Sequence, residues 1–208
     1  MMKQNWFVEA RSNEILTEER WLAEFEEGFL RFQQGRKTGK PHRPKTAKMA
    51  PSNEKSDPET IVLSCSDCSF TPEDIFDRQF GSLYVVTNLG NRVATDSINQ
   101  IRRALSKSSY NHILVLGHEQ CSAVDKMVHF QLGSDCSEEL KTYLRKAGDE
   151  IRLIAPVKSQ KNFGSTWVEK NVIAGVEQLK ELGISESCQI GGIVVDLGSP
   201  NSSFRSYV

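Results

Sequence analysis

The sequence lacks three features that would each point to a particular class of protein. No apolar run approaches the ~20 residues needed to cross a bilayer, and the start leads into charged residues rather than a signal-peptide core. Charge of neither sign is in excess, since 26 Lys and Arg residues balance 27 Asp and Glu. Five cysteines among 208 residues are too few for a disulfide scaffold, and their number is odd. We therefore expect a cytoplasmic protein without nucleic-acid or membrane partners, whose cysteines do not serve as disulfides.

The composition that is present is globular, but it changes along the chain. Residues 1–34 form a first segment, in which apolar spacing predicts an amphipathic helix over residues 15–34 that packs on a protein surface. Residues 35–59 hold four prolines and seven Lys or Arg residues, which predicts an extended linker. A nucleic-acid footprint is the weaker interpretation of this basic run, because no aromatic residue is interleaved. The apolar positions of the helix are Leu16, Trp21, Leu22, Phe25, Phe29, Leu30 and Phe32.

Residues 60–208 alternate short apolar runs with helical segments. This alternation predicts an α/β domain with a mainly parallel sheet. Buried strands are expected at residues 61–63, 83–86, 112–116 and 190–195. Helices are expected near residues 72–79, 95–107, 121–131, 137–153 and 165–182.

Two clusters of metal-binding residue types follow two of the predicted strands. Cys65 and Asp67 come directly after the first strand, and His118 and Cys121 come after the third. Open α/β sheets bind ligands beyond the carboxyl ends of their strands. Thiolate and imidazole suit Zn²⁺, and Cys65, His118 and Cys121 would leave a fourth position for water, as in catalytic zinc sites. Asp67 would orient that water or displace it.

Other interpretations of the cysteines remain open on spacing alone. Cys65 and Cys68 form a C-x-x-C sequence, which is also typical of thioredoxin-like redox pairs. That interpretation leaves His118 and Cys121 without a role. A single cysteine at a strand end is, in addition, often a small buried hydrophobe.

Cys65-Ser66-Asp67, followed by His118-x-x-Cys121, resembles the signature of the β-class carbonic anhydrases. The intervening residues resemble the family as well: Pro72-Glu73-Asp74-Ile75-Phe76 is similar to its PE-x-I-F stretch, and residues 81–91 to GDLFVVRNAGN. Residues 112–118 are similar to HIVVCGH. The resemblance is dense from Ile61 to about Val128 and looser in residues 29–35 and 168–195.

The resemblance implies a fold and an activity. The fold is a doubly wound, mainly parallel sheet with an N-terminal helical arm that embraces a second subunit, giving a homodimer or a larger homo-oligomer. The activity is the reversible hydration of CO₂ to bicarbonate by zinc-bound hydroxide. Carried over by motif, Cys65, His118 and Cys121 are the Zn²⁺ ligands, and Asp67 is the catalytic residue that accepts a hydrogen bond from the zinc-bound water.

The sequence departs from the family at the position that pairs with Asp67. The family motif is C-x-D-x-R, and its arginine keeps the aspartate off the metal, whereas this chain has Ser69. A hydroxyl cannot form the bidentate ion pair of a guanidinium. Thr87, Leu89 and Ser122 also replace the family's arginine, alanine and glycine.

Three hypotheses follow from this substitution. The first is an active carbonic anhydrase, with Arg78, Arg92 or a partner residue replacing the missing arginine. The second is a zinc-binding homologue with little hydratase activity and a regulatory or binding role, in which Asp67 is a fourth metal ligand and closes the site. The third is a hydrolase of CS₂ or COS.

Overall fold

The structure is a computed structural model that describes residues 6–37, 59–78, 81–131, 138, 167–184, 188–198 and 203–208. Its helices are α1 (Trp6–Lys37), α2 (Pro72–Ile75), α3 (Thr95–Leu105), α4 (Ser122–Gln131) and α6 (Trp167–Glu181). Its strands are β1 (Thr60–Cys65), β2 (Leu83–Asn88), β3 (His112–His118), β4 (Gln189–Val195) and β5 (Phe204–Tyr207). None of the helices in these ranges combines the length and apolar character needed to cross a membrane.

The five strands form one sheet in the order β2-β1-β3-β4-β5. The pairs β1–β2, β1–β3 and β3–β4 are parallel, and β5 adds to the edge of β4 in the antiparallel direction. The chain moves from β1 to β2 on one side and then returns to place β3 on the other side of β1. The predicted doubly wound, mainly parallel sheet is therefore confirmed, and its strand order reverses between β1 and β3.

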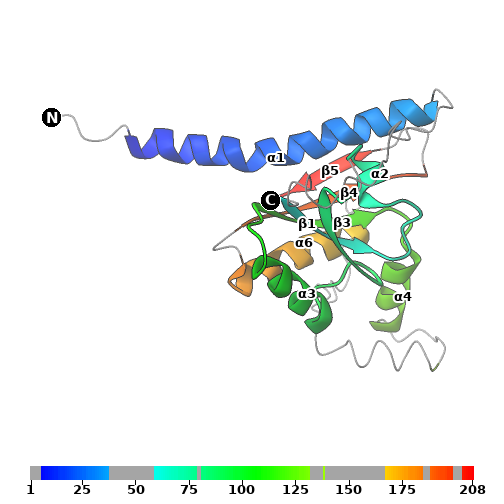
Figure 1. Ribbon diagram of the computed structural model, residues 1–208. Helices are drawn as coiled ribbons and strands as arrows, with labels where there is room; N and C mark the ends of the chain where they lie inside the picture. Colours follow the sequence, from blue (N-terminus) through cyan, green and yellow to red (C-terminus); the bar gives the residue numbers. More distant parts are fainter. Residues whose placement is uncertain are drawn as a thin grey trace, which may run out of the picture.

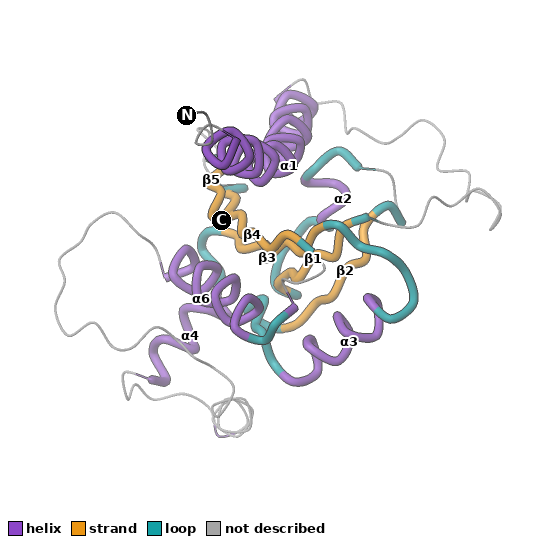
Figure 2. The backbone as a smooth tube through the Cα atoms, turned by 90° about the vertical axis from the view of Figure 1, so that its left-hand side faces the viewer, coloured by secondary structure: helices purple, strands orange, loops and turns teal. Residues whose placement is uncertain are grey.

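Helices cover both faces of this sheet (Figures 1 and 2). The long helix α1 and the short helix α2 lie on one face, while α3, α4 and α6 lie on the other. Because both faces are covered, the central strands β1, β3 and β4 are buried along nearly their whole length, and β1 is buried at every position. In the sequence, strands of this kind read as continuous apolar runs rather than as an alternation of apolar and polar residues.

The aromatic stripe of α1 packs on the chain's own sheet. Trp21, Leu22, Phe25 and Phe29 are buried in one cluster with residues of β1, β3 and β4. The helix approaches the core closely at Gly28, where an added Cβ would lie 2.0 Å from the carbonyl oxygen of Phe76. The observed helix extends beyond the predicted 15–34 at both ends. Its embrace of a second subunit stays a prediction.

Other predicted elements differ from the structure in extent. Helix α2 ends at Ile75 instead of continuing to residue 79. Strand β5 was not predicted. Residues 38–58 of the expected linker and nearly all of the helix expected at 137–153 lie outside the described residues.

Candidate metal centre

The reversal of strand order brings three predicted ligands together. Cys65 ends β1, His118 ends the neighbouring parallel strand β3, and Cys121 immediately precedes α4. The ligand atoms of these three residues lie within 4.8 Å of one another, and the two Sγ atoms are 3.5 Å apart. Both cysteines are buried, and His118 is partly buried. This is the crevice in which doubly wound sheets hold their ligands.

The surroundings of Cys65 stabilise a thiolate. The Cys121 thiol lies within hydrogen-bonding distance of the Cys65 sulfur, which also accepts from the backbone N–H groups of Gly90 (3.2 Å) and Asp67 (3.4 Å). The contact with Cys121 is the main cause that lowers the pKa of Cys65 to about 4, and the backbone donors add to it. The same contact raises the pKa of Cys121. These contacts thus favour the thiolate form of Cys65, which is the form that binds a metal cation.

The Gly90 loop that donates to Cys65 is itself held in place. Gly90 adopts a left-handed backbone conformation (φ 78°), and its carbonyl oxygen accepts a hydrogen bond from the Asn171 side chain at 3.0 Å. Asn171 belongs to α6 and therefore connects that helix to the metal centre. No sequence motif marked Asn171, because its role depends on how α6 packs against the sheet.

His118 presents one ring nitrogen to the site. Its Nδ1 lies 3.2 Å from the carbonyl oxygen of Glu119, so Nδ1–H donates there and Nε2 keeps a lone pair. Nε2 is buried and has no hydrogen-bond partner among the described residues. Burial is the largest single influence and lowers the pKa of His118, but Cys65, the Glu119 carbonyl and Asp67 together raise it above its ordinary value. An orphaned imidazole nitrogen beside two sulfur atoms fits a tetrahedral cation such as Zn²⁺.

Strand β5 supports the same corner of the site. The Glu119 side chain forms an ion pair with Arg205 of β5. Tyr207 lies two residues further along β5, and its hydroxyl donates a hydrogen bond to the Glu169 side chain of α6 at 2.6 Å. The unpredicted strand thus anchors the residue whose carbonyl orients His118.

Asp67 has a partner that the sequence did not predict. Its Oδ2 accepts a hydrogen bond from the hydroxyl of Ser122 at 2.7 Å. Ser122 is the first residue of α4 and follows the predicted ligand Cys121. The signal available in the sequence was the replacement of the family's glycine by a residue with a donor. Among the described residues, Ser122 is the partner of the Asp67 carboxylate, and Ser69 forms no hydrogen bond to it.

The two arginines considered as replacements are occupied elsewhere. Arg78 pairs with Glu24 of α1 at 3.3 Å and lies over the ring of Phe25. Arg92 donates from Nε to the carbonyl oxygen of Leu89 at 3.0 Å. Within the described residues, neither forms an ion pair with Asp67.

The C-x-x-C sequence does not form a dithiol pair. Cys65 belongs to the core on the α3/α4/α6 face, whereas Cys68 packs against the cluster on the α1 face. Both are free thiols, and burial raises the pKa of Cys68. The sulfur that Cys65 meets is that of Cys121, so the redox interpretation has no geometric support here.

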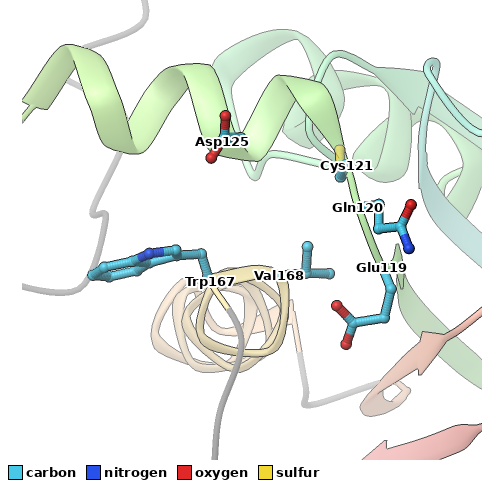
Figure 3. A pocket seen from close by; sticks show the side chains of 6 residues that line it. All are labelled: Glu119, Gln120, Cys121, Asp125, Trp167 and Val168. Atoms are coloured by element: carbon cyan, nitrogen blue, oxygen red, sulfur yellow. The ribbon is translucent and has the colours of Figure 1, made fainter. Parts of the chain in front are cut away.

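A cavity of about 350 Å³ lies beside α4 and α6, and Cys121 is the one predicted metal ligand among its lining residues. Figure 3 shows Cys121 and Gln120 near one end, with Asp125 on α4 and Trp167 at the start of α6 farther away. Glu119 and Val168 complete the lining. The volume lies within the ~300–1,000 Å³ typical of small-molecule sites.

The match to a family model decides the family. Residues 60–197, which include every residue of the candidate centre, match the model described as "Carbonic anhydrase". This chain belongs to the β-class carbonic anhydrase family.

Curated relatives match over part of their length. Carbonic anhydrase 2 of Mycobacterium tuberculosis (strain CDC 1551 / Oshkosh) is 31% identical over 68 residues, which is 33% of each chain. A carbonic anhydrase of Synechococcus elongatus is 24% identical over 139 residues, 62% of this chain and 51% of the relative. The chain thus spans about a third of the length of the first of these relatives.

Solved β-carbonic anhydrases share the fold. The β-carbonic anhydrase CcaA has a TM-score of 0.56 and 17% identity, covering 92% of this chain and 87% of its own. The Coccomyxa β-carbonic anhydrase has a TM-score of 0.53 and 18% identity, covering 98% and 86%. A chain from a study of two tetrameric β-carbonic anhydrases of Sordaria macrospora has a TM-score of 0.50 and 20% identity. The match covers 99% of this chain and 100% of the Sordaria chain.

Proposed function

We propose that this protein is a zinc-dependent enzyme that reversibly hydrates CO₂ to bicarbonate, with Cys65, His118 and Cys121 as the zinc ligands. The observation that carries the proposal is the convergence of two sulfur atoms and one imidazole within 4.8 Å. Zn²⁺ favours this donor set, and three protein ligands leave one coordination position for chemistry. Membership of the β-class family supports the reaction.

The chain's own residues would hold the metal and orient the reactants. When bound, Zn²⁺ lowers the pKa of a water molecule from 15.7 to about 7. The Glu119 carbonyl fixes the tautomer of His118, and the Gly90 amide stabilises the charge on Cys65. We assign Asp67 the role of accepting a hydrogen bond from the attacking water. Substrate would enter through the cavity beside Cys121.

We also propose that the protein is a homo-oligomer of the reducing cytoplasm. The Sordaria macrospora enzymes that share its fold are described as tetrameric, which supports self-association. The free thiols of Cys65, Cys68 and Cys121 favour a reducing compartment, where they stay available for a metal.

One observation favours a second candidate. Ser69 stands at the family's arginine position, and no arginine among the described residues forms an ion pair with Asp67. A carboxylate near Zn²⁺ can itself become the fourth ligand. The alternative is thus a zinc-binding homologue whose closed site has a binding or regulatory role.

A stopped-flow assay of CO₂ hydration separates the two candidates. We expect zinc-loaded protein to accelerate hydration above the buffer rate between pH 7 and 9, and His118→Ala to abolish the acceleration because it removes a metal ligand. Rates equal to buffer throughout, in protein that carries zinc, would contradict the hydratase proposal and favour the closed site. The same protein is then assayed with CS₂ and COS.

A further inference from the structure

Asp67 lies where a carboxylate and a metal would attract each other. It follows the ligand Cys65 by two residues, and its backbone N–H donates to the Cys65 sulfur at 3.4 Å. Its side chain is exposed rather than shielded by the core. A carboxylate oxygen is an ordinary zinc ligand, so an unrestrained Asp67 would compete with water for the fourth position.

The restraint on Asp67 comes from the other ligand-bearing loop. Ser122 follows Cys121 directly, and its hydroxyl donates to Asp67 Oδ2 at 2.7 Å. Hydrogen bonds to a carboxylate are stronger than those between neutral groups, and 2.7 Å is short enough for a good one. This bond fixes the direction of the carboxylate relative to both cysteines, because Asp67 lies two residues after Cys65 and Ser122 lies directly after Cys121.

By the family resemblance Ser69 occupies the arginine position, but in the described structure Ser69 forms no hydrogen bond to the Asp67 carboxylate. The donor comes instead from a position where glycine is the family's residue, and glycine has no side chain to donate. The serine at position 122 thus supplies a hydrogen-bond donor to Asp67, and this donor compensates for the loss of the arginine at position 69.

We propose that Ser122 is a positioning residue that holds Asp67 away from the fourth coordination position of the metal and so replaces the family's arginine. Oδ2 is occupied by Ser122, and Oδ1 stays available to accept a hydrogen bond from a reactant. The proposal rests on the proposed function, because it assumes a metal held by Cys65, His118 and Cys121. It predicts an open site in spite of Ser69.

The test measures access to the metal instead of catalysis. Co²⁺ replaces Zn²⁺, and sodium thiocyanate is titrated while the visible absorption of Co²⁺ reports binding of the anion at an open position. Wild-type protein is expected to bind thiocyanate. Ser122→Ala should bind it about tenfold more weakly, which is the loss expected for one hydrogen bond to a charged group. Ser122→Thr keeps the hydroxyl and should bind thiocyanate as wild type does.

Two further variants separate positioning from a general structural effect. Ser69→Ala is the matched control, a serine in the same loop as Asp67, and should leave thiocyanate binding unchanged. In Ser122→Ala/Asp67→Ala no carboxylate remains to bind the metal, so thiocyanate binding should return. A double variant that stays closed would mean that Ser122→Ala acts by disturbing the fold, and would overturn the proposal.

Three other results would also overturn the proposal. The first is wild-type protein that does not bind thiocyanate, and the second is Ser122→Ala protein that binds it as tightly as wild type. The third is a loss of thiocyanate binding in Ser69→Ala but not in Ser122→Ala. Protein that takes up neither Zn²⁺ nor Co²⁺ overturns the proposed function together with this inference. Metal-loaded protein in which Ser122→Ala behaves as wild type overturns the inference alone.

Discussion

Residue type does not determine what a cysteine does in this chain; its neighbours do. Cys65 and Cys68 are three residues apart, yet their side chains join cores on opposite faces of the sheet. Cys65 receives two backbone N–H donors and the Cys121 thiol, which favours the thiolate that binds metal. Burial has the opposite effect on Cys68 and raises its pKa.

This difference predicts the zinc content of two matched variants. Cys65→Ser should be purified with little zinc, because it removes one of three ligands and no other cysteine lies within reach in the described structure. Cys68→Ser should retain the zinc of the wild-type protein. Elemental analysis after gentle purification measures both. Loss of zinc from Cys68→Ser, with Cys65→Ser unaffected, would contradict the ligand assignment.

The residues of the site were predictable to different degrees. The meeting of Cys65 with His118 and Cys121 followed from the sequence, because the carboxyl ends of neighbouring parallel strands share one sheet edge. The bond between Ser122 and Asp67 did not. It joins two loops, and side-chain directions in loops depend on tertiary packing that no local pattern encodes.

Elements were predicted where a periodic pattern is long or continuous. The central strands β1, β3 and β4 are buried on both faces, so each reads as an apolar run, and the partly buried edge strand β2 begins with a shorter apolar run, Leu83 to Val86. Strand β5 is short and mixed (Phe-Arg-Ser-Tyr), and it forms by pairing with β4 rather than from its own propensity. The end of α2 was placed too late, because only one turn of helix follows Pro72 before the chain turns.

Contact between α1 and β3 predicts a pH dependence of stability. The His112 ring stacks on Trp21 with centroids 4.5 Å apart, and burial lowers the pKa of His112 below 6.5, although Glu24 and Glu59 act in the opposite direction. The unfolded chain therefore binds this proton more readily than the folded one. The contribution is fully present above pH 6.5 and is lost as pH falls below it.

His112→Phe tests this coupling between the two elements. Phenylalanine keeps a flat ring for Trp21 but does not titrate. Chemical denaturation from pH 7.5 to 5 should show a steeper loss of unfolding free energy in wild type than in the variant, and the metal centre, present in both proteins, cancels in the difference. Parallel curves, or a steeper loss in the variant, would contradict the prediction.

At the scale of the whole molecule, α1 has two stretches with different roles. From Trp21 to Phe29 it covers one face of the sheet, with four large apolar side chains buried in this chain's own core. Burying each contributes about 1.5–3 kcal/mol, so this stretch belongs to the fold itself. The amino-terminal stretch of the helix projects beyond the sheet in Figure 1, and the proposed embrace of a second subunit depends on it.

Two truncations separate these roles. Deleting residues 1–19 retains Trp21 to Phe29, so the melting temperature should change by only a few degrees while the mass in solution falls from oligomer to monomer. Deleting residues 1–37 uncovers the sheet face formed by Val62, Leu114 and Ile193, and cooperative unfolding should disappear. Light scattering and thermal denaturation measure the two effects.

An unchanged oligomer after the shorter deletion would refute the embracing arm. Normal melting after the longer deletion would refute the packing of α1 as a structural requirement. The shorter deletion leaves every residue of the metal centre in the chain, so its zinc content should equal that of the full-length protein.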